Sequence, residues 1–175
     1  MQTPEKKSNL ILIGMPASGK STLGVVLAKA LGYDFLDTDL LIQNTTGKRL
    51  EALMDEHGID GFLELEEKIN AGVACHHTVI APGGSVIYGP KAMEHFKEIG
   101  TILYLKVSLE DLTGRLSNMK ARGVALRDGM TLEDLYRERT PLYERYADLT
   151  VSEEDRSIGD MVEAITAMLR EQGRI

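Results

Sequence analysis

One short segment limits what this chain can fold into more than any other: a glycine-rich turn between an aliphatic run and an amphipathic pattern. Residues 10–13 read Leu-Ile-Leu-Ile, as in a strand that is buried on both faces of a parallel sheet. The turn reads Gly14-Met15-Pro16-Ala17-Ser18-Gly19-Lys20-Ser21-Thr22 and matches G-x-x-x-x-G-K-[S/T]. A helix is predicted over residues 21–31, with one apolar face formed by Leu23, Val26, Leu27 and Ala30.

Between a strand and a helix, this turn predicts a phosphate-binding loop (P-loop). Its main-chain N–H groups and the helix N-terminus would surround an anion. Lys20 would reach the β- and γ-phosphates, and the Ser21 hydroxyl would bind Mg²⁺. A glycine-rich turn without a ligand is the alternative, which the strand and helix on either side disfavour. The candidates for binding ATP are Gly14, Ala17, Ser18, Gly19, Lys20, Ser21 and Thr22.

The rest of the chain alternates short apolar runs with helical patterns. Strands are predicted at 35–36, 78–81, 101–105 and 149–151, and helices at 108–116, 131–146 and 158–169. Residues 40–71 read as polar helices broken near 47–48 and 57–58, and residues 117–130 read as a loop. This order predicts an α/β protein of three layers, α/β/α, with a five-stranded parallel sheet and a P-loop NTP hydrolase fold. The 175 residues suit a single domain.

Polar residues follow two further predicted strands, so the topology would bring them to the P-loop. Asp37 and Asp39 form an acidic turn, in which one carboxylate would face the metal and the other the substrate. An acidic N-cap pair is the alternative. Gly83 and Gly84 would let main-chain N–H groups approach a ligand, although a plain tight turn is nearly as good a reading. A basic stretch could bind phosphates or carboxylates: Arg115, Lys120, Arg122, Arg127, Arg137 and Arg139. Several of these side chains must instead be simply exposed to solvent.

Composition excludes several classes of protein. The net charge of −7 argues against a nucleic-acid partner. The single cysteine, Cys75, allows no internal disulfide and fits a reducing compartment. The apolar run 10–13 is too short for a membrane span or a signal peptide, so we expect a cytoplasmic protein without a membrane partner. We also expect a monomer. His76 and His77 are adjacent and poorly placed to bind one metal ion together.

In order and spacing these motifs resemble the shikimate kinase family, within the nucleoside-monophosphate-kinase-like P-loop fold, over about residues 10–151. The matching pieces are residues 14–22, Phe35-Leu36-Asp37-Thr38-Asp39, Gly61-Phe62 with Glu66, Gly83-Gly84, Arg115, Arg122 and Glu138-Arg139-Thr140-Pro141-Leu142-Tyr143. Together they are far more specific than any one motif. The resemblance implies a kinase that uses ATP and Mg²⁺ to phosphorylate a small anionic or zwitterionic hydroxy-acid.

On the nucleotide side, the resemblance implies that Lys20 and Arg122 are catalytic and contact the phosphates. Arg122 would belong to a lid over about residues 117–130, whose closure excludes water. Arg115 would pack on the adenine, and Asp37 would support Mg²⁺ through water.

On the acceptor side, the resemblance implies a binding subdomain over about residues 38–70. Asp39 would hold the acceptor hydroxyls and act as the base. Gly83 and Gly84 would offer N–H groups, and Arg139 would bind the acceptor carboxylate. Leu63 and Glu66 complete the predicted acceptor site.

Three positions depart from the family pattern. Leu63 stands where the family has a second carboxylate-binding arginine, Ser85 where it has a third glycine, and Arg122-Gly123-Val124 where it has Arg-Pro-Leu. Shikimate is the default acceptor. Without that arginine, Glu66 is free to pair with a positive group, so homoserine, with an ammonium for Glu66 and a carboxylate for Arg139, is the alternative. Another cation could also replace the arginine, such as Lys48 or Lys68.

Other functions of the same fold fit less well. A non-catalytic nucleotide-binding regulator predicts damage at Lys20, Ser21 or Asp39, and all three are present. A GTPase switch needs an Asn-Lys-x-Asp motif, which does not occur. A nucleotide kinase would want more arginine in residues 40–75 than Arg49 alone.

Overall fold

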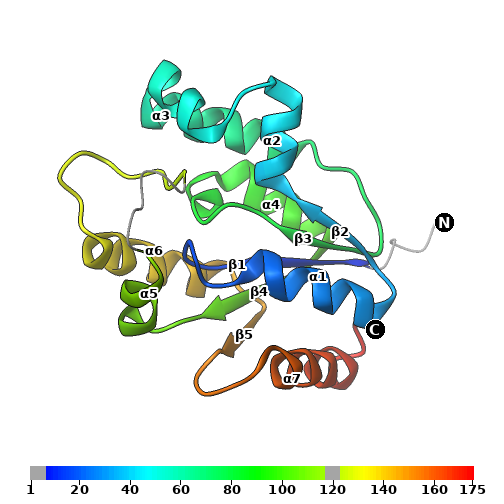
Figure 1. Cartoon of the computed structure of the whole chain (residues 1–175). Helices are drawn as coiled ribbons and strands as arrows, with labels where there is room; N and C mark the ends of the chain where they lie inside the picture. The colour runs from blue at the N-terminus through cyan, green and yellow to red at the C-terminus, as the bar shows by residue number, and fades with distance from the viewer. Residues whose placement is uncertain (1–6, 117–122) are drawn as a thin grey trace.

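A five-stranded sheet forms the centre of the computed structural model, which describes residues 7–116 and 123–175 (Figure 1). The strands are β1 (Asn9–Ile13), β2 (Asp34–Asp37), β3 (Thr78–Ala81), β4 (Gly100–Lys106) and β5 (Leu149–Ser152), in the order β2-β3-β1-β4-β5. Every neighbouring pair is parallel; Leu10 of β1, for example, lies beside Val79 of β3 and Thr101 of β4. The predicted α/β class and parallel sheet are confirmed.

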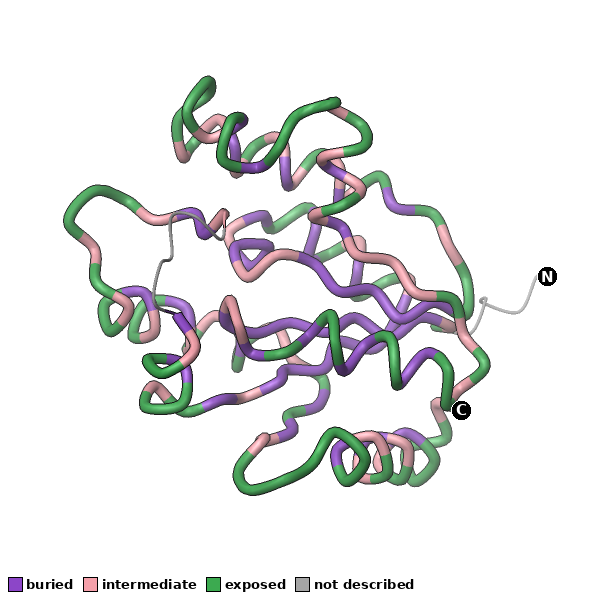
Figure 2. Tube along the Cα trace, in the orientation of Figure 1, coloured by how far each residue is buried: buried purple, intermediate pink, exposed green. Residues whose placement is uncertain are grey.

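Burial follows the position of each strand in the sheet. All residues of β1 and β3 are buried, and so is β4 up to Lys106, whereas the edge strands β2 and β5 are partly exposed. In Figure 2 the central strands are accordingly the most continuous buried segments. The apolar run that predicted β1 is therefore the middle of the core.

The helices are α1 (Lys20–Leu31), α2 (Thr38–Thr46), α3 (Leu50–Ala71), α4 (Pro90–Ile99), α5 (Leu109–Arg115), α6 (Leu132–Tyr146) and α7 (Ile158–Glu171), with a 3₁₀ turn η1 (Val86–Tyr88). From β1 the chain moves to β2 in one direction across the sheet, and from β3 to β4 in the other. Right-handed crossovers therefore place α1 and α4 on opposite faces. The helix α7 packs beside α1, and α6 packs on β4 and η1, which completes the three layers.

The structure corrects three local predictions. On α1, Val26 and Ala30 are exposed, and the buried apolar face is formed by Leu23, Leu27 and Ala28 with Gly24. Residues 37–39 do not form a turn, because the Asp37 carboxylate caps a helix that begins directly at Thr38. The helix α4 was not predicted at all. Its buried face consists only of Ala92, Met93 and Phe96 between charged residues, so its apolar pattern is short.

The break predicted near residues 57–58 lies inside α3, at Gly58, where φ is 71° and ψ is 174°. Only glycine adopts this combination readily. The predicted N-cap Thr131 forms a capping box with Asp134 at the start of α6. Among the described residues, no helix is both long and apolar enough to cross a bilayer.

The topology brings the polar turns together. The strand order reverses at β1, so the loop after this strand opens between helices on opposite faces of the sheet. Because β1, β2 and β3 are parallel, β2 and β3 end at the same edge as β1. Ligands of open parallel sheets bind at such a reversal.

Candidate active site

A cavity of about 400 Å³ lies at this edge, and most predicted site residues meet in it. Its walls come from the P-loop, α2, α3, the turn after β3, α6 and the segment that precedes α6. The lining residues are Pro16, Ala17, Gly19, Lys20, Ser21, Thr22, Asp39, Phe62, Ala81, Pro82, Gly83, Gly84, Ser85, Leu116, Gly123, Val124, Ala125 and Arg139.

The P-loop holds its lysine in place by internal contacts. Lys20 Nζ donates to the carbonyls of Gly14, at 2.9 Å, and Met15, at 2.8 Å, and lies 3.4 Å from the Ser18 hydroxyl. Burial lowers the pKa of Lys20 to about 8, partly opposed by the charge of Asp39. Ser18 and Gly14 shape the loop from behind and do not line the cavity.

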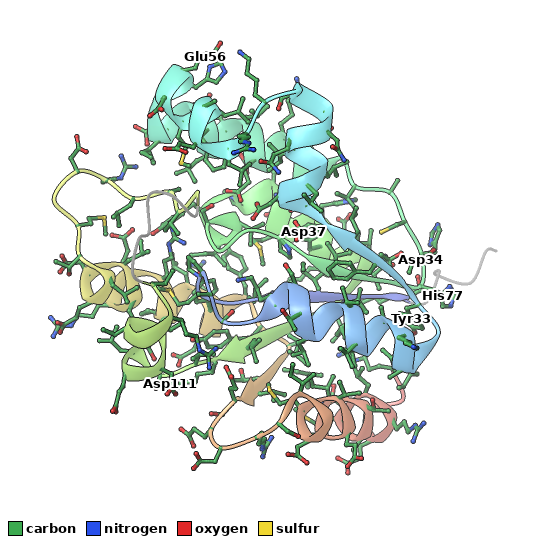
Figure 3. All side chains as sticks on the ribbon, viewed as in Figure 1. Tyr33, Asp34, Asp37, Glu56, His77 and Asp111 are labelled. Carbon is green, nitrogen blue, oxygen red and sulfur yellow. The ribbon has the colours of Figure 1, made fainter. Side chains whose placement is uncertain are left out.

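Asp37 links the P-loop to the start of α2. Its Oδ2 accepts a 2.9 Å hydrogen bond from Ser21, and its Oδ1 accepts from the N–H groups of Asp39 and Leu40 at the start of α2. The N-cap alternative for Asp37 is therefore correct, and the predicted role toward Mg²⁺ stays a prediction. In Figure 3 Asp37 stands where β2 passes into α2. A hydroxyl and a carboxylate are hard oxygen donors, which is the chemistry that Mg²⁺ prefers.

Asp39 lies in the first turn of α2 and faces the cavity. Burial, and then the charge of Asp37, raise its pKa from the ordinary 3.8 to about 6, while Lys20 opposes the shift. No side-chain hydrogen bond of this carboxylate occurs among the described residues, so its oxygens are available to a ligand. A carboxyl that titrates near 6 can accept a proton close to neutral pH.

Arg139 projects from α6 and is only 1% exposed. Its Nη2 donates to the Ala125 carbonyl at 2.8 Å, and its guanidinium lies over the Tyr88 ring, 5.3 Å from the ring centre. Among the described residues it has no carboxylate partner, and its Nε has no hydrogen-bond partner. A buried guanidinium without a counter-charge is typical of a site for an anionic ligand.

Glu66 is buried in α3, close to Asp39 and Arg139, and is only 2% exposed. The sequence left it free for a positive group, but its partner in the structure is the Ser85 hydroxyl, which donates to Oε2 at 2.7 Å. Burial raises the pKa of Glu66 from 4.5 to about 7, the Ser85 hydrogen bond lowers it, and Asp39 raises it further. Ser85, known from the sequence only as a departure, is thus part of the site.

Three predicted residues lie elsewhere or outside the described chain. Leu63 does not line the main cavity; it faces a small neighbouring space of about 40 Å³ beside Tyr88. Arg115 donates to the Ala17 carbonyl and forms a two-pronged ion pair with Glu153, at 2.7 and 3.1 Å, next to the P-loop. Arg122 lies outside the described residues.

The lysines considered as replacements for the arginine lie away from the site. Lys48 pairs with Glu56 on an exposed surface, and Lys68 is exposed. His77 packs against Tyr33 at the opposite end of the sheet from Asp37, with 5.5 Å between ring centres (Figure 3). In the part of the chain that is described, no three His, Cys, Asp or Glu side chains are grouped to bind a metal ion.

Tyr143 was part of the predicted motif but had no assigned role. Its hydroxyl donates to the Gly84 carbonyl at 2.6 Å, and its ring stacks on Tyr104 of β4. Tyr143 therefore ties α6 to the glycine turn. Glu153, which follows β5 and fixes Arg115, gave no signal in the sequence because only the fold brings the two together.

Known proteins share this arrangement. The family model described as "Shikimate kinase" matches residues 16–170. The shikimate kinase of Chlorobium chlorochromatii is 35% identical over 93% of this chain and 91% of its own length. That of Clostridium botulinum is 40% identical over 78% of this chain and 83% of its own length.

Solved structures agree. The shikimate kinase of Acinetobacter baumannii in complex with shikimate superposes with a TM-score of 0.87 and 27% identity, covering 97% of this chain and 96% of that one. The Aquifex aeolicus shikimate kinase gives 0.80 and 26% identity, over 94% and 98% of the two chains. A gluconokinase of Sinorhizobium meliloti, at 18% identity and a TM-score of 0.57, shares the fold. The chain belongs to the shikimate kinase family of phosphotransferases.

Proposed function

We propose that this protein transfers the γ-phosphate of ATP to a hydroxyl of shikimate. The observation that carries the proposal is one cavity in which the P-loop lysine, the Asp39 carboxylate and the buried Arg139 guanidinium meet. Arg139 would bind the acceptor carboxylate, and Asp39 would orient the hydroxyl and accept its proton as its oxygen attacks. The relatives above supply the identity of the acceptor.

The nucleotide side of the cavity suits a metal-bound triphosphate. Lys20 and the main-chain N–H groups of the P-loop would hold the phosphates. Ser21 and Asp37 would hold Mg²⁺, since their oxygens lie together and the ion commonly keeps only one or two protein ligands beside phosphates and water. When bound, Mg²⁺ neutralises charge that develops on the phosphates. Arg115 would contact the adenine from beside the P-loop, and Arg122 the phosphates.

Residues 38–70 would form the acceptor-binding part, and residues 117–130 a lid. The described part of this lid supports the assignment. Ala125 packs in a cluster with Ile42, Leu50, Leu53 and Phe62 of α2 and α3, and Arg127 pairs with Asp60 at 2.7 Å. The lid segment thus contacts the acceptor-binding part directly, as a cover that excludes water would.

The proposal is tested by ADP release from ATP and Mg²⁺ with and without shikimate. We expect shikimate-dependent release that Lys20→Ala lowers by about 100-fold or more, because a positioned charge on the transferred phosphate is lost. Lys29→Ala, an exposed change on the same helix, is the control and should retain activity. A folded Lys20→Ala protein with normal turnover would refute the P-loop assignment.

A further inference from the structure

Two buried groups have hydrogen-bonding capacity that the described residues do not use: Arg139, which lines the cavity, and Glu66, which lies directly beside the lining residue Gly83. Glu66 Oε1 and Arg139 Nε are buried and have no partner among the described residues. A buried polar atom left without a partner is unfavourable, because its hydrogen bonds to water are lost and not replaced. Both belong to ionisable groups of opposite charge, so a ligand with groups of both charges would satisfy them.

Gly83 and Gly84 show how close these two groups are. A Cβ atom built on Gly83 would lie 2.7 Å from Asp39 Oδ1 and 2.8 Å from Glu66 Oε1, and one built on Gly84 would lie 3.1 Å from Arg139 Nη1. Consecutive Cα atoms are about 3.8 Å apart. The two carboxylates therefore lie beside Gly83 and the guanidinium beside the next residue, so one ligand at this turn can contact charged groups of both signs.

Positive groups lie near the two carboxylates, Lys20 near Asp39 and Arg139 near Glu66, but in the described chain neither carboxylate is in direct contact with one. Neither Asp39 nor Glu66 forms an ion pair among the described residues. The hydrogen bonds of Lys20 are used within the P-loop. A ligand hydroxyl offers one donor, which Asp39 needs for phosphoryl transfer, whereas an ammonium offers three. A second donor group on the ligand would satisfy Glu66.

We propose that the same site also phosphorylates hydroxy-α-amino acids, with the carboxylate on Arg139, the ammonium on Glu66 and the side-chain hydroxyl on Asp39. This proposal rests on the proposed function, because the phosphoryl donor and the P-loop are the same. The hydroxyl oxygen forms a bond to the γ-phosphorus, the bond from this phosphorus to the β–γ bridging oxygen breaks, and ADP leaves. The hydroxyl proton passes to Asp39 and then to solvent.

Ser85 is a positioning residue for this second acceptor. Its hydroxyl donates to Glu66 Oε2, which fixes the carboxyl group and leaves Oε1 for the ligand. A hydrogen bond to the carboxylate also favours its ionised form, which an ammonium requires. Ser85 is itself buried, so water does not compete for this bond.

The charge of Glu66 gives the amino-acid reaction its own pH dependence. The groups facing Glu66 are Asp39 from α2, Arg139 from α6 and Ser85 from the glycine turn, and burial sets its pKa at about 7. An ammonium binds ionised Glu66, so the KM for an amino acid should fall as pH rises through 7. Shikimate has no ammonium and should not show this decrease.

The test measures ADP release with L-homoserine as the probe and shikimate alongside, over pH 6 to 8. We expect homoserine to support turnover and to give a phosphate ester in the ³¹P NMR spectrum. Glu66→Gln should lower kcat/KM for homoserine by about tenfold or more, since a hydrogen bond to a charged group is lost, and should remove the decrease of KM with pH. The effect on shikimate should be smaller. Glu67→Gln, whose carboxylate contacts the Lys91 N–H instead, is the matched control.

The outcomes separate this inference from the proposed function. Turnover of shikimate without turnover of homoserine at any pH overturns the inference and leaves the proposed function standing. Homoserine turnover that Glu66→Gln reduces no more than it reduces shikimate turnover removes Glu66 from the ammonium site. Turnover of neither acceptor refutes both.

Discussion

Arg139 is the side chain on which the proposed acceptor site depends most. It is buried, yet in the described part of the chain its one hydrogen bond goes to the Ala125 carbonyl rather than to a carboxylate. Retaining such a group costs desolvation, which a carboxylate on the acceptor would offset. A substitution of Arg139 should therefore affect binding of the acceptor and not binding of the nucleotide.

Arg139→Lys should raise the KM of the acceptor by about tenfold or more while leaving the KM of ATP nearly unchanged. Lysine keeps the charge but loses the planar fork that binds a carboxylate through two hydrogen bonds. Steady-state kinetics with each substrate varied in turn make the measurement. Arg137→Lys, an exposed change on the same helix, should alter neither constant. Equal increases in both constants would place Arg139 outside the acceptor site.

The sequence predicted individual residues best where a short motif fixes the local backbone. The P-loop lysine and serine, Asp39, Gly83, Gly84 and Arg139 all line the cavity, as expected. The Ser85–Glu66 hydrogen bond was not predictable, because it joins residues 19 apart whose contact depends on how α3 packs beside the glycine turn. The position of Leu63 on a neighbouring space depends on the same packing.

Among the elements, α3 contains a backbone break at Gly58 whose contribution to stability a single substitution can measure. Gly58 interrupts the helix in a conformation that side chains rarely adopt, and a Cβ atom there would meet no other atom within 4 Å. Its sequence neighbourhood predicted a break, since His57-Gly58 divides two polar segments. The short apolar face of α4, in contrast, gave too weak a pattern to predict a helix.

Gly58→Ala should lower the free energy of unfolding by about 1–3 kcal/mol through backbone strain alone. Gly114→Ala is the matched control, because Gly114 is helical, exposed and equally free of neighbours. It should stabilise the protein by about 0.5–1 kcal/mol, since alanine suits a helix interior better than glycine. Urea unfolding of both variants measures the difference. A Gly58→Ala protein as stable as the wild type would show that α3 can straighten without cost.

At the scale of the whole molecule, two buried carboxyl groups of the candidate active site lower the free energy of unfolding near neutral pH. Asp39 and Glu66 have pKa values of about 6 and about 7, raised chiefly by burial above their ordinary 3.8 and 4.5. The folded protein therefore binds protons more tightly than the unfolded chain between about pH 4 and 7. Stability must fall as pH rises through this window.

The melting temperature of the ligand-free protein should thus be highest near pH 5 and several degrees lower at pH 7.5. Below pH 4 it should fall again, because the hydrogen bonds that lower the pKa of the capping residues Asp134 and Asp160 are lost on protonation. Thermal scans across pH test this. Glu66→Gln should flatten the decline between pH 5 and 7.5, and a wild type that gains stability toward pH 7.5 would contradict the burial argument.

The general architecture was the most predictable property of the chain. Buried strands read as unbroken apolar runs, and right-handed crossovers then leave few arrangements for them. The sequence could not show how the segment before α6 is placed, because its contacts with Leu50, Phe62 and Arg139 depend on packing between parts distant in the chain.

The hydrogen bond from Arg139 to the Ala125 carbonyl has a practical consequence for anyone engineering this enzyme. The same guanidinium serves as the proposed grip on the substrate and as the anchor of the covering segment. A bulky replacement of the buried Ala125 would displace the main chain there, and with it the carbonyl to which Arg139 donates. Its kinetic signature would then resemble a defect in substrate recognition, although the altered side chain is not the one that grips the substrate.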